Sequence, residues 1–140
     1  MKQKAEERCG VCGCRLHRSG EYAQETLKGR SHATMHHFVA ERFFGRSKNR
    51  RGSIRAKIFP CCPWGLEGKT AVYCYECHEE LLHNPVLLPK DMELFRELVQ
   101  SRGLDEREKP EHREKIAGRI QLLHDVIASG LRQLTGVTLD

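Results

Sequence analysis

The sequence predicts a small α+β protein, and three observations carry the prediction. Two short stretches, residues 32–39 and 70–73, have the residue types of strands. Helix-forming residues follow at 76–82, and amphipathic patterns continue toward the end of the chain. At 140 residues the chain is long enough for one domain with a modest core, so we expect a single domain over residues 1–140.

The helices are predicted from residue spacing and from signals at their ends. The first must stop near Asn84, because a residue before proline avoids the α region. Asp91 is a suitable N-cap for a second helix at 91–101. A third is expected at 110–134, where apolar residues recur every three or four positions and share one face. These helices form a C-terminal extension over residues 90–140, which packs on the core of a monomer or joins two chains as a homodimer.

Composition places the chain among soluble proteins with a mild bias toward polyanions. No apolar run approaches the length of a membrane span, and the first residues lack the apolar segment of a signal peptide. We therefore expect a cytoplasmic protein with no membrane partner. The formal net charge is +5, and basic residues concentrate between residues 42 and 57, a stretch without an acidic residue.

Two cysteine pairs have the spacing of metal-binding knuckles. Cys9 and Cys12 form the first pair, and Cys74 and Cys77 form the second. Four thiolates suit a closed tetrahedral zinc ion, which would tie the N-terminus to the start of a helix. Buried thiols without a metal are the alternative.

Three further cysteines lie outside these pairs. Cys14 could replace Cys12 as a ligand, although its spacing is poorer. Cys61 and Cys62 are adjacent, and core positions are their simpler role.

Histidines supply a second candidate site. His36 and His37 stand together near the end of the first expected strand, and His78 follows Cys77 directly. Adjacent strand residues point to opposite faces, so one of the pair would turn toward a metal and the other toward water or substrate. Imidazoles with open coordination positions suit a catalytic divalent ion. The alternatives are a core or surface histidine pair, and a second structural zinc site.

The order of these motifs resembles that of the zinc-containing HNH endonucleases, the ββα-metal nuclease group. The matching features are the first cysteine knuckle, His36-His37, a strand, and the run Cys-x-x-Cys-His-x-x-x-Leu that begins at Cys74. The similarity covers residues 8–89 and implies a zinc-stapled ββα-metal core there. Similar short proteins are nicking enzymes of phages and bacteria.

The resemblance implies a role for each histidine. His36 would bind the divalent ion, His78 would be the second ligand, and His37 would be the general base that takes a proton from water. The implied reaction is hydrolysis of a phosphodiester bond in double-stranded DNA, and a single active centre would nick one strand. Zn²⁺ would be structural and Mn²⁺ or Mg²⁺ catalytic; a histidine-rich site favours Mn²⁺ or softer ions such as Co²⁺ and Ni²⁺.

Two departures from the family pattern bear on the site. Members often have an asparagine that orients the catalytic histidine; here Asn49, in the basic loop, is the candidate, and a backbone carbonyl could take its place. Members also often have a second helix histidine four residues after the first, where this chain has Leu82 followed by His83. A five-residue step on a regular helix turns about 140°. His83 would therefore be a ligand only if the helix broke before Pro85.

The basic stretch between the two strands is the predicted DNA contact. Its side chains would bind phosphates beside the metal: Arg46, Lys48, Arg50, Arg51 and Arg55. An ordinary solvated loop is the alternative. For the chain as a whole, the competing function is a non-catalytic zinc module that binds nucleic acid or protein.

Overall fold

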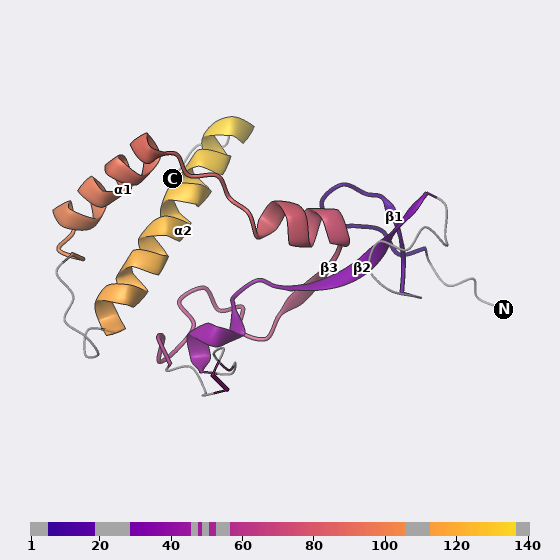
Figure 1. Ribbon diagram of the computed structural model, residues 1–140, viewed down its shortest axis with the longest axis horizontal. Helices are drawn as coiled ribbons and strands as arrows, with labels where there is room; N and C mark the ends of the chain where they lie inside the picture. Colours follow the sequence, from indigo (N-terminus) through magenta and orange to yellow (C-terminus); the bar gives the residue numbers. More distant parts are fainter. Residues whose placement is uncertain are drawn as a thin grey trace. The chain divides into compact units, whose positions relative to one another are not determined.

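The computed structural model describes residues 6–18, 29–45, 48, 51–52, 57–105 and 113–136. Over these ranges the protein is α+β, with a three-stranded sheet followed by helices (Figure 1). The chain divides into two compact units: unit 1 is Met1–Glu41 with Cys62–Val86, and unit 2 is Arg42–Cys61 with Leu87–Asp140. The predicted boundary between core and extension, at residues 89 and 90, lies close to the break after Val86, but unit 2 also takes in Arg42–Cys61.

Unit 1 is built around the sheet, whose strands lie in the order β1-β2-β3. β1 (Arg15–His17) pairs with β2 (Arg30–His37) in parallel, and β2 pairs with β3 (Thr70–Cys74) in the antiparallel sense. Both predicted strands are present, and the first begins and ends two residues earlier than expected. β1 was not predicted, because three residues are too few to show an alternating pattern.

The helix that follows β3 is not an α-helix. η2 (Glu76–Leu82) is a π-helix, whose backbone hydrogen bonds close from residue i to i+5. The helix expected at 76–82 is therefore present with those bounds, and its geometry is π instead of the α geometry of a regular helix. The predicted stop is confirmed: the side-chain amide of Asn84 donates to the carbonyls of Glu79 and Glu80, both at 3.0 Å. These bonds satisfy carbonyl groups that the end of a helix leaves free.

The core of unit 1 is small and rich in sulfur. Within the described ranges, its fully buried apolar cluster contains Leu16, Ala33 and three cysteines, namely Cys9, Cys74 and Cys77. Leu16 is the one large aliphatic side chain in that cluster, and burying such a side chain contributes about 1.5–3 kcal/mol. Apolar burial alone therefore gives this unit little stability.

Unit 2 contains α1 (Pro89–Ser101) and α2 (Arg113–Thr135). α1 begins two residues earlier than predicted, with Pro89 in its first turn and Leu88 as the N-cap residue. The predicted N-cap role of Asp91 is wrong. Asp91 instead lies inside the first turn, where its Oδ2 accepts a hydrogen bond from the Leu88 N–H at 2.9 Å.

On α2 the predicted apolar stripe is covered at one end and open at the other. In this stripe Ile116, Ile120 and Leu123 are half-buried, whereas Ile127, Leu131 and Leu134 are exposed. Gly118 makes a close approach possible, because a Cβ there would lie 2.6 Å from Leu104 Cδ2. Among the helices that the structure describes, none combines the length and the apolar character that crossing a bilayer requires.

Candidate metal centres

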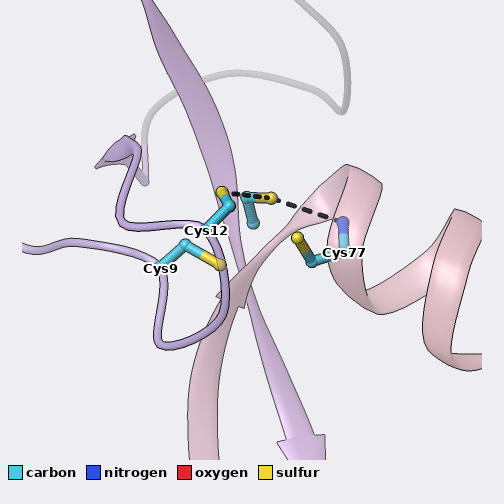
Figure 2. A group of neighbouring side chains, drawn as sticks. Cys9, Cys12 and Cys77 are labelled. Atoms are coloured by element: carbon cyan, nitrogen blue, oxygen red, sulfur yellow. Dashed lines mark hydrogen bonds between the residues drawn. The ribbon is translucent and has the colours of Figure 1, made fainter. Parts of the chain in front are cut away.

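Four cysteines from separate parts of unit 1 meet in one cluster. Their four Sγ atoms all lie within 4.8 Å of one another, and they belong to Cys9, Cys12, Cys74 and Cys77. The Sγ atoms of Cys12 and Cys74 are 3.8 Å apart. Figure 2 shows the sulfurs of Cys9, Cys12 and Cys77 turned toward one another. This group could hold a metal such as zinc, as the sequence predicted.

Local backbone geometry places these sulfurs. In the first knuckle Gly13 has φ +77°, and the Val11 N–H donates to Cys9 Sγ at 3.4 Å. In the second, the Cys77 N–H donates to Cys74 Sγ at 3.3 Å. Gly10 lets the first knuckle approach β3, since a Cβ there would lie 2.7 Å from the Tyr73 ring. Backbone N–H groups aimed at sulfur favour the thiolate form, which is the form that binds metal.

The pKa values of the four thiols are pulled in opposite directions. Burial opposes ionisation of Cys9, but backbone hydrogen bonds with Cys12, Cys74 and Val11 outweigh it and lower its pKa to about 6. Burial raises the pKa of Cys74, and burial together with the neighbouring Cys74 sulfur raises the pKa of Cys77. Four thiols this close cannot all lose their protons unless a cation lies among them, and a divalent metal supplies that charge. The donor set therefore fits zinc.

The other three cysteines do not join the group. Cys14 packs against the cluster, and its pKa is raised to about 12 by burial and by the sulfurs of Cys12 and Cys74. Cys14 is not among the four cysteines whose sulfur atoms all lie within 4.8 Å of one another, so it is a neighbour of the cluster. Cys61 and Cys62 belong to neither group of metal-ligating side chains that the described residues form.

Three histidines make a second group at the end of the sheet. His36 is near the end of β2, His78 is in the first turn of η2, and His83 caps the C-terminus of η2. One ring nitrogen from each lies within 4.8 Å of the others. The ring centroid of His78 is 5.2 Å from that of His36 and 4.5 Å from that of His83. His78 is buried and His83 is exposed, so the group is accessible from solvent.

The π-helix explains why His83 belongs to this group. In an α-helix, residues four apart lie one turn above each other, whereas in a π-helix residues five apart do so. His78 and His83 are five residues apart and both lie along η2 and its cap. The expectation that His83 lies on another face than His78 holds only for α geometry. The longer spacing between the two histidines was itself the available signal.

Glu79 lies against two of the three histidines, and it was not among the site residues predicted from the sequence. Its Oε1 is 3.2 Å from His78 Nδ1, and its Oε2 is 3.4 Å from His83 Nδ1. His78 Nδ1 is buried and makes no hydrogen bond of good geometry within the described part of the chain. A metal-binding histidine usually has a carboxylate against its other ring nitrogen. The arrangement fits a divalent ion on this group.

Burial also affects the charge state of two of these histidines, the half-buried His36 and the buried His78. It lowers the pKa of His36, and the neighbouring His78 and His83 lower it further. Burial likewise lowers the pKa of His78, although the Glu79 carboxylate opposes this. Both rings therefore favour the neutral form, in which imidazole binds metals.

His37 stands outside the histidine group. Its Nε2 lies 3.4 Å from Oε1 of Glu41, and both side chains are partly exposed. Glu41 begins η1 (Glu41–Phe44), the short 3₁₀ helix after β2. The sequence did not single out Glu41, and its four-residue spacing from His37 was the only signal for this contact.

The basic stretch is described only in part. Lys48 and Arg51 are exposed, as DNA contacts would have to be. The other predicted residues of this stretch lie outside the described ranges: Arg46, Asn49, Arg50 and Arg55.

Comparison with protein-family models, with curated proteins and with solved structures finds no match for this chain. Function is therefore inferred from the two groups of metal-ligating side chains. One is made of sulfur and the other of imidazole nitrogen, so they suit ions with different roles.

Proposed function

We propose that this chain is a divalent-metal-dependent endonuclease of the HNH, or ββα-metal, type that hydrolyses DNA phosphodiester bonds and nicks one strand. One observation carries the proposal: two adjacent histidines near the end of β2 take different positions. His36 joins His78 and His83, while His37 stands apart beside Glu41. This is the arrangement that a metal ligand next to a general base requires. The succession β2, β3, η2 supports a ββα-metal core.

In this proposal the two metal sites have separate roles. The four cysteines hold one structural zinc ion, which fixes the start of η2. The three histidines hold an exchangeable Mn²⁺ or Mg²⁺ ion, with Mn²⁺ favoured by the nitrogen ligands. When bound, that ion would neutralise the charge that develops on the phosphate and on the leaving oxygen.

His37 supplies the general base. With Glu41 facing Nε2, the ring proton is held there, and Nδ1 is left to accept a proton from water. The water oxygen forms a bond to phosphorus as its proton moves to Nδ1. The bond between phosphorus and the 3′ oxygen breaks, and that oxygen takes a proton from solvent. One such centre per chain cuts one strand.

The test is relaxation of a supercoiled plasmid by the His37→Ala variant, with Mn²⁺, Mg²⁺, Co²⁺ and Ni²⁺ supplied in turn. Loss of a general base lowers the rate by about 10²–10⁴-fold. Zinc content and DNA binding should stay near those of the parent. His124→Ala, an exposed histidine on α2, is the matched control and should keep full activity. Activity of His37→Ala within tenfold of the parent would show that His37 is not the base.

Two other functions fit part of the same geometry. A non-catalytic zinc module that binds nucleic acid or protein needs only the cysteine group, and a second structural zinc could occupy the histidine group. Metal analysis separates the three. The nuclease proposal expects one tightly held zinc and one exchangeable ion; two tight zinc ions and no plasmid relaxation would favour a structural role for both sites.

A further inference from the structure

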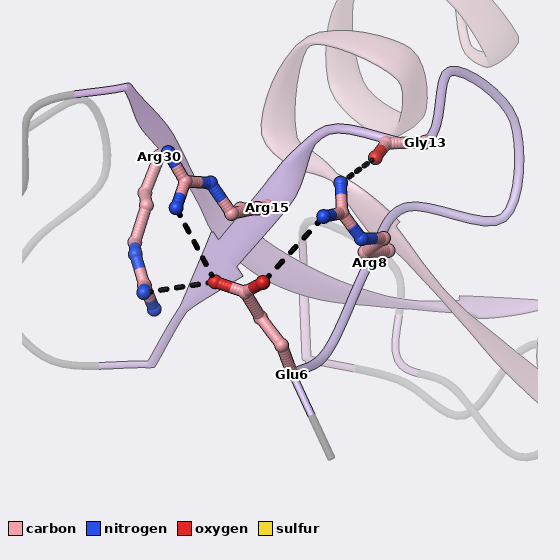
Figure 3. Close-up of polar contacts among 5 residues, drawn as sticks. All are labelled: Glu6, Arg8, Gly13, Arg15 and Arg30. Atoms are coloured by element: carbon pink, nitrogen blue, oxygen red, sulfur yellow. Dashed lines mark hydrogen bonds and ion pairs between the residues drawn. The ribbon is translucent and has the colours of Figure 1, made fainter.

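Three arginines lie side by side across the β1 edge of unit 1. Arg15 is opposite Arg30 in the parallel pairing of β1 with β2, and Arg8 forms an isolated antiparallel bridge with Arg15. All three side chains converge on the Glu6 carboxylate, at 3.5 Å for Arg8, 3.7 Å for Arg15 and 2.9 Å for Arg30. Figure 3 shows this carboxylate between Arg8 on one side and Arg15 and Arg30 on the other. We call these three residues the arginine ladder.

Stability does not account for the arginine ladder. Like charges directly opposite each other on neighbouring strands are destabilising. Glu6 carries one negative charge against three positive charges, and the arginine side chains are 57%, 49% and 36% exposed. Ion pairs this exposed contribute about 0–1 kcal/mol each. Within the described ranges Glu6 is the one acidic partner of the ladder, which therefore keeps an excess of positive charge there.

The ladder also has the right donors for phosphate. Each guanidinium has several N–H donors in a fixed plane, a geometry that matches two oxygens of a phosphate. Contact with Glu6 holds the three groups close together, and Arg8 is fixed further by donating to the Gly13 carbonyl at 3.0 Å. Groups that are already positioned lose less conformational freedom when a ligand binds.

We propose that the arginine ladder is a phosphate-binding surface for the DNA backbone, a partner identified by the function proposed above. Arg30 and His36 are six residues apart on β2, and alternate strand residues share a face. At about 3.3 Å per residue they are about 20 Å apart. With a rise of about 3.4 Å per base pair, the ladder would hold phosphates about six base pairs from the scissile bond.

The first experiment compares two double variants that remove equal charge: Arg15→Gln/Arg30→Gln in the ladder, and Arg102→Gln/Arg132→Gln on exposed positions of unit 2. Binding to a fluorescently labelled 30-base-pair duplex is followed by anisotropy over a range of NaCl concentrations, with no divalent ion added. Loss of two phosphate contacts should reduce the slope of log K against log salt by about two. Equal slopes for the two double variants would overturn the proposal.

The second experiment uses Glu6→Gln, which removes the negative charge but keeps the shape of the side chain and an amide oxygen that can still accept hydrogen bonds from the arginines and hold them close together. If the ladder binds phosphate, Glu6→Gln should bind DNA more tightly, because a competing negative charge is gone. The same variant should unfold at a lower melting temperature, because its ion pairs are lost. A purely structural charge cluster predicts the lower melting temperature with unchanged binding, and that result would also overturn the proposal. DNA binding and cleavage are measured separately, so the two proposals can fail independently. If the parent nicks DNA but Arg15→Gln/Arg30→Gln keeps the parent's salt slope, the ladder alone is rejected. If that variant has an altered slope but the parent never nicks, the nuclease alone is rejected.

Discussion

Glu79 contacts two of the three clustered histidines through the two oxygens of a single carboxylate. A carboxylate in this position would orient both rings and would add a negative charge beside a divalent ion bound to the histidines. His78 and His83 therefore depend on a residue that need not bind the metal itself.

Glu79→Gln keeps the size of the side chain and removes its charge, so it should weaken Mn²⁺ binding. Loss of an orienting carboxylate typically costs about 10–100-fold in metal affinity. Isothermal titration of the zinc-loaded protein with Mn²⁺ measures this without any cleavage assay. Glu80→Gln is the control, because Glu80 is exposed and the contacts with the two histidines come from its neighbour. Equal Mn²⁺ affinity in the two variants would remove Glu79 from the site.

Burial of His36 and His78 also makes stability depend on pH. Their pKa values are lowered in the folded state, chiefly by burial, whereas the unfolded chain has ordinary histidine values of about 6.5. As the pH falls through that value the unfolded state takes up protons first, so the free energy of unfolding decreases. The contribution is complete above pH about 6.5 and is lost as the pH falls toward the lowered values.

Urea unfolding at pH 7.5 and at pH 5.5 measures this effect. Zinc–thiolate bonds also weaken in acid, so the comparison needs a His36→Gln/His78→Gln variant that keeps the cysteine group. The variant should lose less stability between the two pH values than the parent does. An identical loss in both proteins would assign the acid sensitivity to the cysteines.

At the scale of elements, the sequence predicted what spacing and composition control. The strand carrying His36 and His37, the strand before Cys74 and the long C-terminal helix are all present, because each has a pattern several residues long. β1 has three residues and is defined by its neighbour β2 rather than by its own pattern. The π geometry of η2 escaped prediction because α and π helices use the same helix-forming residues, and the choice between them depends on which side chains must meet.

That choice can be tested by deleting Glu80. The deletion brings His78 and His83 to a four-residue spacing, which places both on one face of an ordinary α-helix. We expect η2 to become α-helical. The Mn²⁺ affinity should stay within about tenfold of the parent, which is no more than the low end of the 10–100-fold loss that a missing orienting carboxylate typically causes. Inserting an alanine after Glu80 is the matched control and should separate the two rings. If the deletion abolishes Mn²⁺ binding while the insertion does not, the π-helix is not what brings His83 to the site.

At the scale of the whole molecule, the two units differ in what can stabilise them. Unit 2 has two helices of 13 and 23 residues with apolar faces. Unit 1 has a buried cluster in which three of five residues are cysteines. The cysteine pairs, and the expectation that a metal on them would stabilise the fold, came from the sequence. How few large apolar side chains are buried beside them could be seen only in the folded chain.

Removal of zinc should therefore unfold unit 1 and leave the helices of unit 2 in place. Binding of zinc to thiolates contributes about 10–16 kcal/mol in small peptides, as much as the whole stability of a typical domain. Trp64, the one tryptophan, lies in unit 1, so its fluorescence reports on that unit, while circular dichroism at 222 nm reports mainly on α1 and α2. Addition of a strong zinc chelator should shift the Trp64 emission and keep most of the dichroism signal.

The same dependence should connect the two metal sites. Cys77 lies next to His78 at the start of η2, so loss of the zinc that holds Cys77 frees the backbone that positions the histidine group. Cys77→Ser should therefore lose zinc and, with it, measurable Mn²⁺ binding at pH 7.5. Cys61→Ser removes an exposed thiol outside both groups and should keep both metals. A Cys77→Ser protein that holds no zinc yet binds Mn²⁺ like the parent would show that the sheet and η2 position the histidines without help from the cysteine group.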